Sequence, residues 1–301
     1  MKKEFRSGFI TLVGRPNAGK STFINQILKQ KIAIISDKPQ TTRNKIQGIY
    51  NTSDAQMVFI DTPGIHKPHH ELGKALNKIA LNALKQVDIT LFLISGNEKL
   101  STGNRFIMEQ LEKMANPVFL IINKIDLMNK DEIIKTIDLY QKEYQFTEIV
   151  PISALKNDNV DYLLALIKKY LPEGPQYYPQ DAITDHPERF IISELIREKV
   201  LHKTREEIPH SVAVVIDDIK ERPNSHIIDV LATIVVERKS QKGIIIGKAG
   251  QMLKDIGSLA RIDIQNLLGS KVYLELWVKV IDNWRNRQNI LTEFGYNEKD
   301  N

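Results

Sequence analysis

The stretch that decides the fold is Gly14–Ser21, GRPNAGKS, in which two glycines, a lysine and a hydroxyl stand at fixed offsets. It follows the apolar run FITLV and precedes an amphipathic pattern at 20–30. In this setting we expect the backbone N–H groups of residues 19–21 to converge on a phosphate at a helix N-terminus. The glycines permit close approach, Lys20 can neutralise β- and γ-phosphates, and the Ser21 hydroxyl can ligate Mg²⁺. The alternative is a turn that happens to precede a helix.

A second segment, MVFIDTPGI, carries groups suited to metal and phosphate. Asp61 ends an apolar run, where its carboxylate can hold the water shell of a metal ion. Gly64 follows in a loop whose N–H can meet a γ-phosphate. An ordinary Asp-Thr-Pro-Gly turn is the alternative for this segment taken alone.

The segments LIINKID and PISAL point to a purine base. Asn123, Lys124 and Asp126 directly follow an apolar run. The Asp126 carboxylate can accept hydrogen bonds from both the N1–H and the exocyclic amine of guanine, a pair that adenine lacks. Ser153 and Ala154 follow the next run, where a backbone N–H can meet the guanine O6. Charged turns are the alternative, but four such segments after four strands favour a guanine nucleotide site.

The first part of the chain alternates between short β-branched runs and longer helical patterns. Apolar runs of strand length lie at 9–13, 45–50, 57–61, 89–95, 117–123 and 148–153. Between them apolar residues recur every three or four positions, at 20–30, 72–87, 101–114, 131–144 and 158–171. This alternation predicts an α/β domain with a mostly parallel sheet that is covered on both faces.

A proline-containing stretch separates this domain from a second one. Prolines stand at 172, 175, 179 and 187 without a period, which predicts a linker over 173–187. The remainder shows the patterns of a helix, two strands, a glycine-punctuated helical pair, a strand and a last helix. We therefore expect an α/β domain that binds GTP at 1–172 and a smaller α+β domain at 188–301. A chain of 301 residues is long enough for two domains, each with its own core.

Composition excludes several classes of protein. The chain contains no cysteine, which rules out a disulfide framework and any thiolate metal site and suits a cytoplasmic address. No stretch approaches about 18 uninterrupted apolar residues, so we expect no transmembrane helix. The 42 Lys and Arg residues exceed the 37 Asp and Glu residues, and this net charge of +5 permits a polyanionic partner.

The second domain contains a Gly-x-x-Gly turn, Gly247–Gly250, between two helical patterns. Two glycines alone are weak evidence, since many helix caps would supply them. The surroundings are basic, however, because residues 235–290 hold ten Lys and Arg against five Asp and Glu, an excess of five. Such a surface is consistent with binding of phosphates, and an ordinary solvated face is the alternative.

The motifs GRPNAGKS, QTTRNKIQG, DTPGIHKP, NKID and SAL together resemble the Era family of P-loop GTPases over almost the whole chain. The resemblance implies a Mg²⁺-dependent GTPase. The nucleotide-binding residues that it implies are Gly14, Asn17, Ala18, Gly19, Lys20, Ser21, Thr22, Asp61, Asn123, Lys124, Asp126, Ser153 and Ala154. The implied magnesium ligands are Ser21, Thr42 and Asp61, with Thr41 as the alternative to Thr42. The implied catalytic residues are Lys20, Thr42 and Gly64.

One catalytic part of other GTPases is missing. Ile65 stands where Ras-like GTPases carry the glutamine that orients the attacking water, and an apolar side chain cannot do this. The Era family also lacks this glutamine, which implies slow hydrolysis that depends on phosphate positioning and charge neutralisation. Asn17 resembles the potassium-binding asparagine of related GTPases, so K⁺ is a further candidate cation. A loop-closing hydrogen bond is the alternative for Asn17.

The sequence IGKAGQMLKDI at 246–256 resembles the KH domain, whose Gly-x-x-Gly loop clamps single-stranded RNA. The RNA-binding residues that this implies are Lys242, Gly247, Lys248, Ala249, Gly250 and Lys254. The resemblance to Era implies a cytoplasmic monomer that binds the 3′ end of small-subunit ribosomal RNA and acts in 30S assembly. Peripheral association with the inner face of the cell membrane stays open. A P-loop ATPase or kinase with an accessory RNA-binding domain, and a non-enzymatic RNA-binding module, are the alternatives.

Two other groups of residues suggest different sites. His66, His69 and His70 are histidines of a kind that can bind metal, but they lack helical spacing and a partner cysteine, so we expect a solvated loop. Trp277 and Trp284 could stack on bases. For these two residues we expect an apolar strand face and a helix anchor instead.

Overall fold

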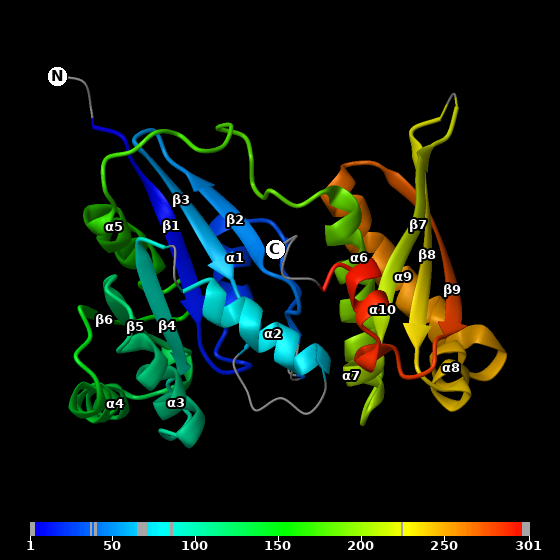
Figure 1. Cartoon of the computed structure of the whole chain (residues 1–301). Coiled ribbons are helices and arrows are strands. Elements are labelled where there is room, and N and C mark those ends of the chain that lie inside the picture. The colour runs from blue at the N-terminus through cyan, green and yellow to red at the C-terminus, as the bar shows by residue number, and fades with distance from the viewer. Residues whose placement is uncertain are drawn as a thin grey trace.

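The computed structural model describes residues 4–36, 38, 41–64, 71–84, 87–223 and 225–296. It consists of two bodies that lie side by side and are joined by an extended segment along one end (Figure 1). The first body contains the alternating strands and helices predicted for the N-terminal part of the chain, and the second contains a smaller sheet with its own helices.

A six-stranded sheet forms the centre of the first body. Its order is β2-β3-β1-β4-β5-β6, and the pairings are parallel except for that of β2 with β3. The strands are β1 (Arg6–Val13), β2 (Ile46–Asn51), β3 (Ala55–Asp61), β4 (Ile89–Ser95), β5 (Val118–Asn123) and β6 (Glu148–Pro151). Every residue of β3, β4 and β5 is buried, because helices cover both faces. The predicted α/β fold with a mostly parallel sheet is confirmed.

The helices of the first body divide between the two faces of the sheet. They are α1 (Lys20–Leu28), α2 (Glu71–Asn82), α3 (Thr102–Leu111), α4 (Lys130–Glu143) and α5 (Val160–Tyr170), with a short 3₁₀ turn η1 (Ile125–Leu127). Apolar residues of α1 and α5 pack in one cluster with β1 and β3, whereas those of α3 and α4 pack in another with β4 and β5. The start of α4 is fixed by a capping box between Asn129 and Glu132.

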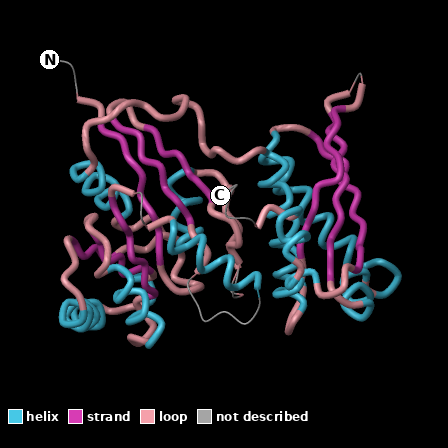
Figure 2. The backbone as a smooth tube through the Cα atoms, in the orientation of Figure 1, coloured by secondary structure: helices cyan, strands magenta, loops and turns pink. Residues whose placement is uncertain are grey.

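The predicted linker at 173–187 crosses to the second body without helix or strand (Figure 2). It nevertheless packs along the first sheet. The Ser7 hydroxyl donates to the Pro175 carbonyl oxygen at 2.6 Å, and the Ile49 N–H donates to that of Ile183 at 2.8 Å. The connection is therefore held against β1 and β2 by hydrogen bonds.

A three-stranded sheet forms the centre of the second body. Its order is β7-β8-β9, with β7 and β8 antiparallel and β8 and β9 parallel. The elements are α6 (Glu188–Lys203), α7 (Ile208–Ser211), β7 (Ala213–Glu221), β8 (Ile227–Val236), α8 (Lys239–Ile246), η2 (Lys248–Gly250), α9 (Gln251–Leu268), β9 (Lys271–Val280), η3 (Trp284–Asn286) and α10 (Gln288–Glu293). This order matches the predicted α+β pattern, with short α7, η2 and η3 added.

Helix α6 lies between its own sheet and the first body (Figure 1). Its burial pattern reflects this position, because it buries the charged residues Glu194, Arg197 and Glu198 together with six apolar ones. No helix in the described part of the chain is long and apolar enough to span a membrane.

Candidate functional site

Two glycines shape the loop between β1 and α1. Gly19 has a φ of 96°, and a Cβ atom there would lie 2.1 Å from Nδ2 of Asn123. A Cβ atom on Gly14 would lie 2.3 Å from the carbonyl oxygen of Leu93. Neither position has room for a side chain, so the loop closes tightly before α1 begins.

Lys20, the first residue of α1, is buried within this loop. Its Nζ donates to the carbonyl oxygens of Gly14 at 3.2 Å and Arg15 at 3.3 Å. Burial lowers the pKa of Lys20, and the charge of the nearby Asp61 carboxylate opposes that shift. An anion bound at the loop would further favour the charged form of the lysine.

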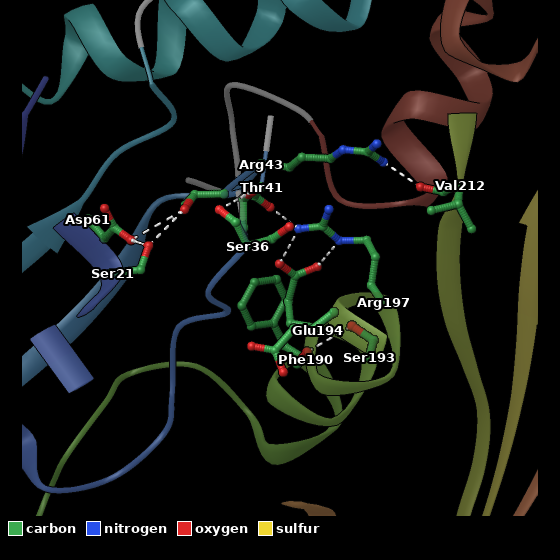
Figure 3. Close-up of polar contacts among 12 residues, drawn as sticks. Ser21, Ser36, Thr41, Arg43, Asp61, Phe190, Ser193, Glu194, Arg197 and Val212 are labelled. Atoms are coloured by element: carbon green, nitrogen blue, oxygen red, sulfur yellow. Dashed lines mark hydrogen bonds and ion pairs between the residues drawn. The ribbon is translucent and has the colours of Figure 1, made fainter. Parts of the chain in front are cut away.

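Ser21, Thr42 and Asp61 meet in one cluster, although they lie on separate segments. Ser21 Oγ donates to Asp61 Oδ2 at 2.7 Å (Figure 3) and lies 3.1 Å from Thr42 Oγ1. Thr42 Oγ1 lies 3.4 Å from the same carboxylate oxygen. Burial raises the pKa of Asp61. The charge of Lys20 and the hydrogen bonds from both hydroxyls act in the opposite direction but do not cancel this rise.

The donor set of this cluster suits a magnesium ion. Two hydroxyls and one carboxylate are oxygen ligands of the kind that Mg²⁺ prefers. The second carboxylate oxygen of Asp61, Oδ1, is buried without a hydrogen-bond partner among the described residues. A buried polar atom of this kind needs a partner, and a metal-bound water would supply one.

Thr41 is directed away from the cluster. Its Oγ1 donates to the carbonyl oxygens of Lys38 at 2.5 Å and Ser36 at 3.4 Å. Of the two adjacent threonines, the geometry therefore favours Thr42 as the one that faces Asp61.

A cavity of about 390 Å³ opens beside the cluster. A Cβ atom on Gly64 would lie 2.9 Å from the backbone nitrogen of Pro16, so the turn after β3 lies against the phosphate loop. Among the residues singled out from the sequence, the cavity is lined by Asn17, Gly19, Lys20, Ser21, Thr22, Thr42, Gly64 and Lys124. Thr41, the alternative to Thr42, also lines it, whereas the sequence patterns did not identify the remaining lining residues, Pro16, Ile34, Ile35, Ser36, Lys38 and Glu98.

Asn123 ties three loops together at the end of β5. Its Nδ2 donates to the carbonyl oxygen of Ala18 at 2.9 Å. Its Oδ1 accepts hydrogen bonds from the N–H groups of Lys124 at 2.8 Å and Ala154 at 3.0 Å. The amide side chain thus links the phosphate loop to the NKID and SAL segments.

Asp126 and Ser153 lie together in the same region. Ser153 Oγ donates to Asp126 Oδ1 at 2.5 Å. Asp126 is exposed, whereas Ser153 is buried. This arrangement leaves the carboxylate in position to accept hydrogen bonds from a base.

Lys31, Ile35, Thr41 and Arg43, on the segment that precedes and follows Thr42, contact the second body, and the sequence patterns did not reveal this contact. Arg43 is fully buried there. Its guanidinium donates to the carbonyl oxygens of Val212 at 2.6 Å (Figure 3) and of Pro209 and His210, both at 3.2 Å. No local pattern marks Arg43, because its partners follow more than 160 positions later.

Helix α6 contributes a second buried guanidinium to this contact. Arg197 forms an ion pair with Glu194 through hydrogen bonds of 2.7 and 2.6 Å. It also donates to the carbonyl oxygen of Thr41 (Figure 3). The backbone next to Thr42 is therefore fixed by the second body.

Four charged residues form ion pairs at another part of this contact between the two bodies. Lys31 and Lys199 each pair with Glu198 and Asp263, at 2.5 to 2.8 Å. Burial would raise the pKa of Glu198, but hydrogen bonds from the two lysines and from the Ile35 N–H outweigh it and lower the pKa. The segment that lines the cavity is thus anchored to α6 and α9 by charge as well as by backbone contacts.

The Gly-x-x-Gly turn joins α8 to α9 on the second body. Gly247, Ala249 and Gly250 have φ values of 72°, 51° and 78°. A Cβ atom on Gly247 would lie 2.7 Å from Cβ of Met252, whereas Gly250 faces open space. Lys248 and Ala249 are exposed at the tip. The turn therefore presents backbone and one lysine to solvent, as a phosphate contact requires.

The two remaining predicted RNA-binding lysines flank this turn. Lys254 is exposed on the first turns of α9, and Lys242 is half-buried on α8. All four residues of the turn and both lysines therefore lie on one continuous stretch of α8, η2 and α9.

The two tryptophans differ in burial. Trp284 is fully buried, and its Nε1 donates to the Ser211 carbonyl oxygen at 2.9 Å, so the expected anchor is confirmed. The expectation of an apolar strand face for Trp277 was wrong, because its side chain is 61% exposed. β9 is an edge strand, and what covers its outer face depends on tertiary packing that the local sequence does not encode.

Ile65 and the histidines His66, His69 and His70 lie outside the described residues. Within the described ranges, no group of three His, Cys, Asp or Glu side chains is placed to hold a metal ion.

Comparison with known proteins matches both bodies. A family described as 50S ribosome-binding GTPase matches residues 9–124, and the KH domain matches residues 207–285. Two relatives named GTPase Era, from Staphylococcus haemolyticus and Alkaliphilus metalliredigens, are each 56% identical to this chain. The alignments cover 98% of both proteins in the first case, and 97% of this chain and 99% of the relative in the second.

Two solved structures have the same architecture as the whole chain. One is a variant of Aquifex aeolicus Era bound to GDP and AlF₄⁻, with 42% identity and a TM-score of 0.94. The other is Era in complex with MgGDPNP and nucleotides 1506–1542 of 16S ribosomal RNA, with 43% identity and a TM-score of 0.94. Each similarity covers 97% of this chain and 99% of the solved one.

Proposed function

Because the chain belongs to the Era family of GTPases, we propose that it is a GTP-hydrolysing switch that binds single-stranded ribosomal RNA and acts in assembly of the 30S subunit. The observation that carries the RNA part is the similarity over 97% of this chain to an Era protein in complex with a 16S ribosomal RNA fragment. The exposed Gly-x-x-Gly turn supports it from the chain's own geometry.

We assign the phosphates of GTP to the loop before α1. The backbone N–H groups of residues 18–22, around the start of α1, would meet these phosphates, and Lys20 would neutralise the β- and γ-phosphates. Ser21, Thr42 and Asp61 would hold Mg²⁺, which when bound neutralises charge on the phosphate oxygens. The short contacts among these three side chains and the unpartnered Asp61 Oδ1 support this assignment.

Hydrolysis in this proposal depends on charge stabilisation. The Gly64 N–H would contact the γ-phosphate, Thr42 would respond to its presence, and Lys20 would stabilise the charge that develops. Ile65 supplies no group to orient water, so we expect slow turnover.

We further assign K⁺ to Asn17, whose backbone adopts a φ of 66° at the rim of the cavity. Turnover should then be faster in KCl than in NaCl at equal ionic strength, and Asn17→Ala should erase the difference. Equal rates in the two salts for the parent protein would contradict this assignment.

We assign the guanine to the cluster around Asp126. The Asp126 carboxylate would accept the two guanine donors through its two oxygens, with Ser153 and Ala154 beside it. Asn123 would act mainly by holding these loops to the phosphate loop, and Lys124 lines the cavity. A preference for guanine at this cluster would argue against the alternative of an ATPase or kinase.

We assign RNA phosphates to the turn Gly247–Gly250, with Lys242 and Lys254 on either side. The proposal divides the chain into a GTPase domain at 1–172, a linker at 173–187 and a KH domain at 188–301. It places the protein in the cytoplasm as a monomer. Co-sedimentation with anionic vesicles at physiological salt would test whether the basic surface also binds a membrane.

Cross-linking and sequencing of bound RNA tests the proposed partner. The full chain is purified from ultraviolet-irradiated cells, and the cross-linked RNA is sequenced. We expect enrichment of the 3′ end of 16S ribosomal RNA over its 5′ end. Equal recovery of the two ends would contradict the proposed target, and absence of cross-linked RNA would contradict RNA binding itself.

A further inference from the structure

We propose that Trp277, on the outer face of the C-terminal sheet, is a stacking platform for a base of the RNA strand held at the Gly-x-x-Gly turn. This inference rests on the proposed RNA binding and adds a second point of contact to it. It makes Trp277 a further binding residue, on a different face of the sheet from the helices that form the turn.

Trp277 lies on the side of β9 opposite to the helices. Leu274 and Leu276 of this strand pack against the core formed with α9. Side chains alternate along a strand, so Tyr273 and Trp277 lie on the other face. Trp277 is 61% exposed there, whereas the chain's other tryptophan is fully buried. An exposed indole at a sheet edge offers a flat aromatic face on which a ligand ring can stack.

The indole is held in a fixed orientation with its faces available. Its Nε1 donates to Oε1 of Glu275 at 2.9 Å, which satisfies the polar edge of the ring. In the part of the chain that the structure describes, no other ring or guanidinium packs on the indole. Tyr273 is different, because the Arg222 guanidinium lies 5.1 Å from its ring centre. Trp277 is therefore the aromatic residue of β9 that can receive a base.

The pocket beside Trp277 is basic. Lys239 and Lys242 of α8 and Lys279 of β9 line it together with the indole. Within the described ranges, none of these three lysines takes part in an ion pair. An aromatic face surrounded by unpaired cations matches single-stranded nucleic acid, whose bases stack and whose phosphates are anionic. An apolar peptide would leave the three ammonium groups without partners.

Helix α8 connects the pocket to the Gly-x-x-Gly turn. Helix α8 carries Lys239 and Lys242 and leads directly into Gly247. Gly247 follows Lys242 by five positions, which is about 7.5 Å along a helix axis. One RNA strand can therefore contact the turn and then pass over the free edge of β9 to the indole.

Titration of tryptophan fluorescence with RNA tests the proposal. The chain has two tryptophans, and Trp284 is buried, so quenching by a fragment equivalent to nucleotides 1506–1542 of 16S ribosomal RNA reports on Trp277. We expect saturable quenching in the parent protein. Trp277→Leu should weaken RNA binding about tenfold to hundredfold, measured by anisotropy of labelled RNA, while Trp277→Phe retains most of the affinity.

The matched control is Tyr162→Leu, which removes an aromatic residue of similar exposure, 57%, from α5 of the first body. It should change RNA affinity less than about threefold, because Tyr162 lies outside the body that carries the Gly-x-x-Gly turn. Melting temperature and GTP affinity should stay at parent values in all three variants. The slope of affinity against salt should also be unchanged by Trp277→Leu, since stacking releases no counterions.

The outcomes separate this inference from the proposed function. If the parent protein binds RNA but Trp277→Leu binds it equally tightly, or if RNA does not quench the fluorescence, the stacking role is wrong and the proposed function stands. If Trp277→Phe binds as weakly as Trp277→Leu, stacking is also wrong. If the parent protein does not bind RNA, both are wrong.

Discussion

Single side chains in the nucleotide site serve both chemistry and architecture. Lys20, the residue assigned to the phosphates, donates hydrogen bonds to two carbonyl oxygens of its own loop. Asn123 joins three loops through one amide group. The sequence motifs identified both residues by type and spacing. The motifs did not reveal that Asn123 is occupied by backbone partners, because that follows from how three loops meet at the sheet edge.

The assignment of guanine to Asp126 gives a prediction about base preference. Asp126→Asn should weaken GTP binding at least tenfold and shift preference toward xanthosine triphosphate, because an amide NH₂ can donate to the carbonyl that replaces the guanine amine. Competition titrations with a fluorescent nucleotide would measure both affinities. Asp131→Asn, at the exposed start of α4, is the control and should bind GTP like the parent. Unchanged GTP affinity in Asp126→Asn would contradict the assignment.

At the scale of elements, the glycine turns were the most predictable features. The strand, loop and helix order around Gly14–Ser21 is a local pattern, and the structure contains β1, the loop and α1 in that order. The Gly-x-x-Gly turn was likewise located between two helices. Both turns use positive φ values that glycine adopts at low cost, so the residue type itself carries the signal.

The turn before α1 gives a prediction about backbone geometry. Gly19→Ala places a Cβ atom 2.1 Å from Asn123 Nδ2 at a φ of 96°, so the loop or the amide must move. We expect at least a tenfold loss of GTP affinity by calorimetry and a lower melting temperature, from strain of about 1–3 kcal/mol. Gly243→Ala, inside α8 where a Cβ would meet nothing within 4 Å, should leave GTP affinity unchanged and should not lower the melting temperature. Normal GTP affinity in Gly19→Ala would show that the loop is not closed as described.

At the scale of the whole molecule, the segment that carries Thr42 both lines the candidate nucleotide site and contacts the second domain. The segment that carries Thr42 contacts the second body through the hydrogen bonds of Arg43 and Arg197. It also does so through the ion pairs of Lys31 with Glu198 and Asp263. These contacts join residues more than 150 positions apart, and they depend on how two folded bodies meet. Periodicity and motifs carry no information of that kind, which is why the sequence predicted each domain but not their contact.

The buried Arg43 gives a prediction about stability. Arg43→Met removes the donor to three carbonyl oxygens on the second body, and unpaired buried acceptors cost about 1–3 kcal/mol. We expect a loss of at least about 2 kcal/mol in the free energy of unfolding, measured by denaturant titration. Arg105→Met breaks an exposed ion pair with Glu143 and should cost less than about 1 kcal/mol. Equal stability of the two variants would contradict the contact between the bodies.

The most direct test of the central claim, that this GTPase binds RNA through its Gly-x-x-Gly turn, is an anisotropy titration of the 16S fragment. The parent protein is compared with the double variant Lys248→Asp, Ala249→Asp, which keeps both glycines and places two carboxylates at the exposed tip. Aspartate tolerates the left-handed conformation of Ala249, so the turn can still form. We predict unchanged melting and GTP affinity, about a hundredfold loss of RNA affinity, roughly 3 kcal/mol, and a shallower salt dependence. RNA binding by the double variant as tight as that of the parent would contradict the claim.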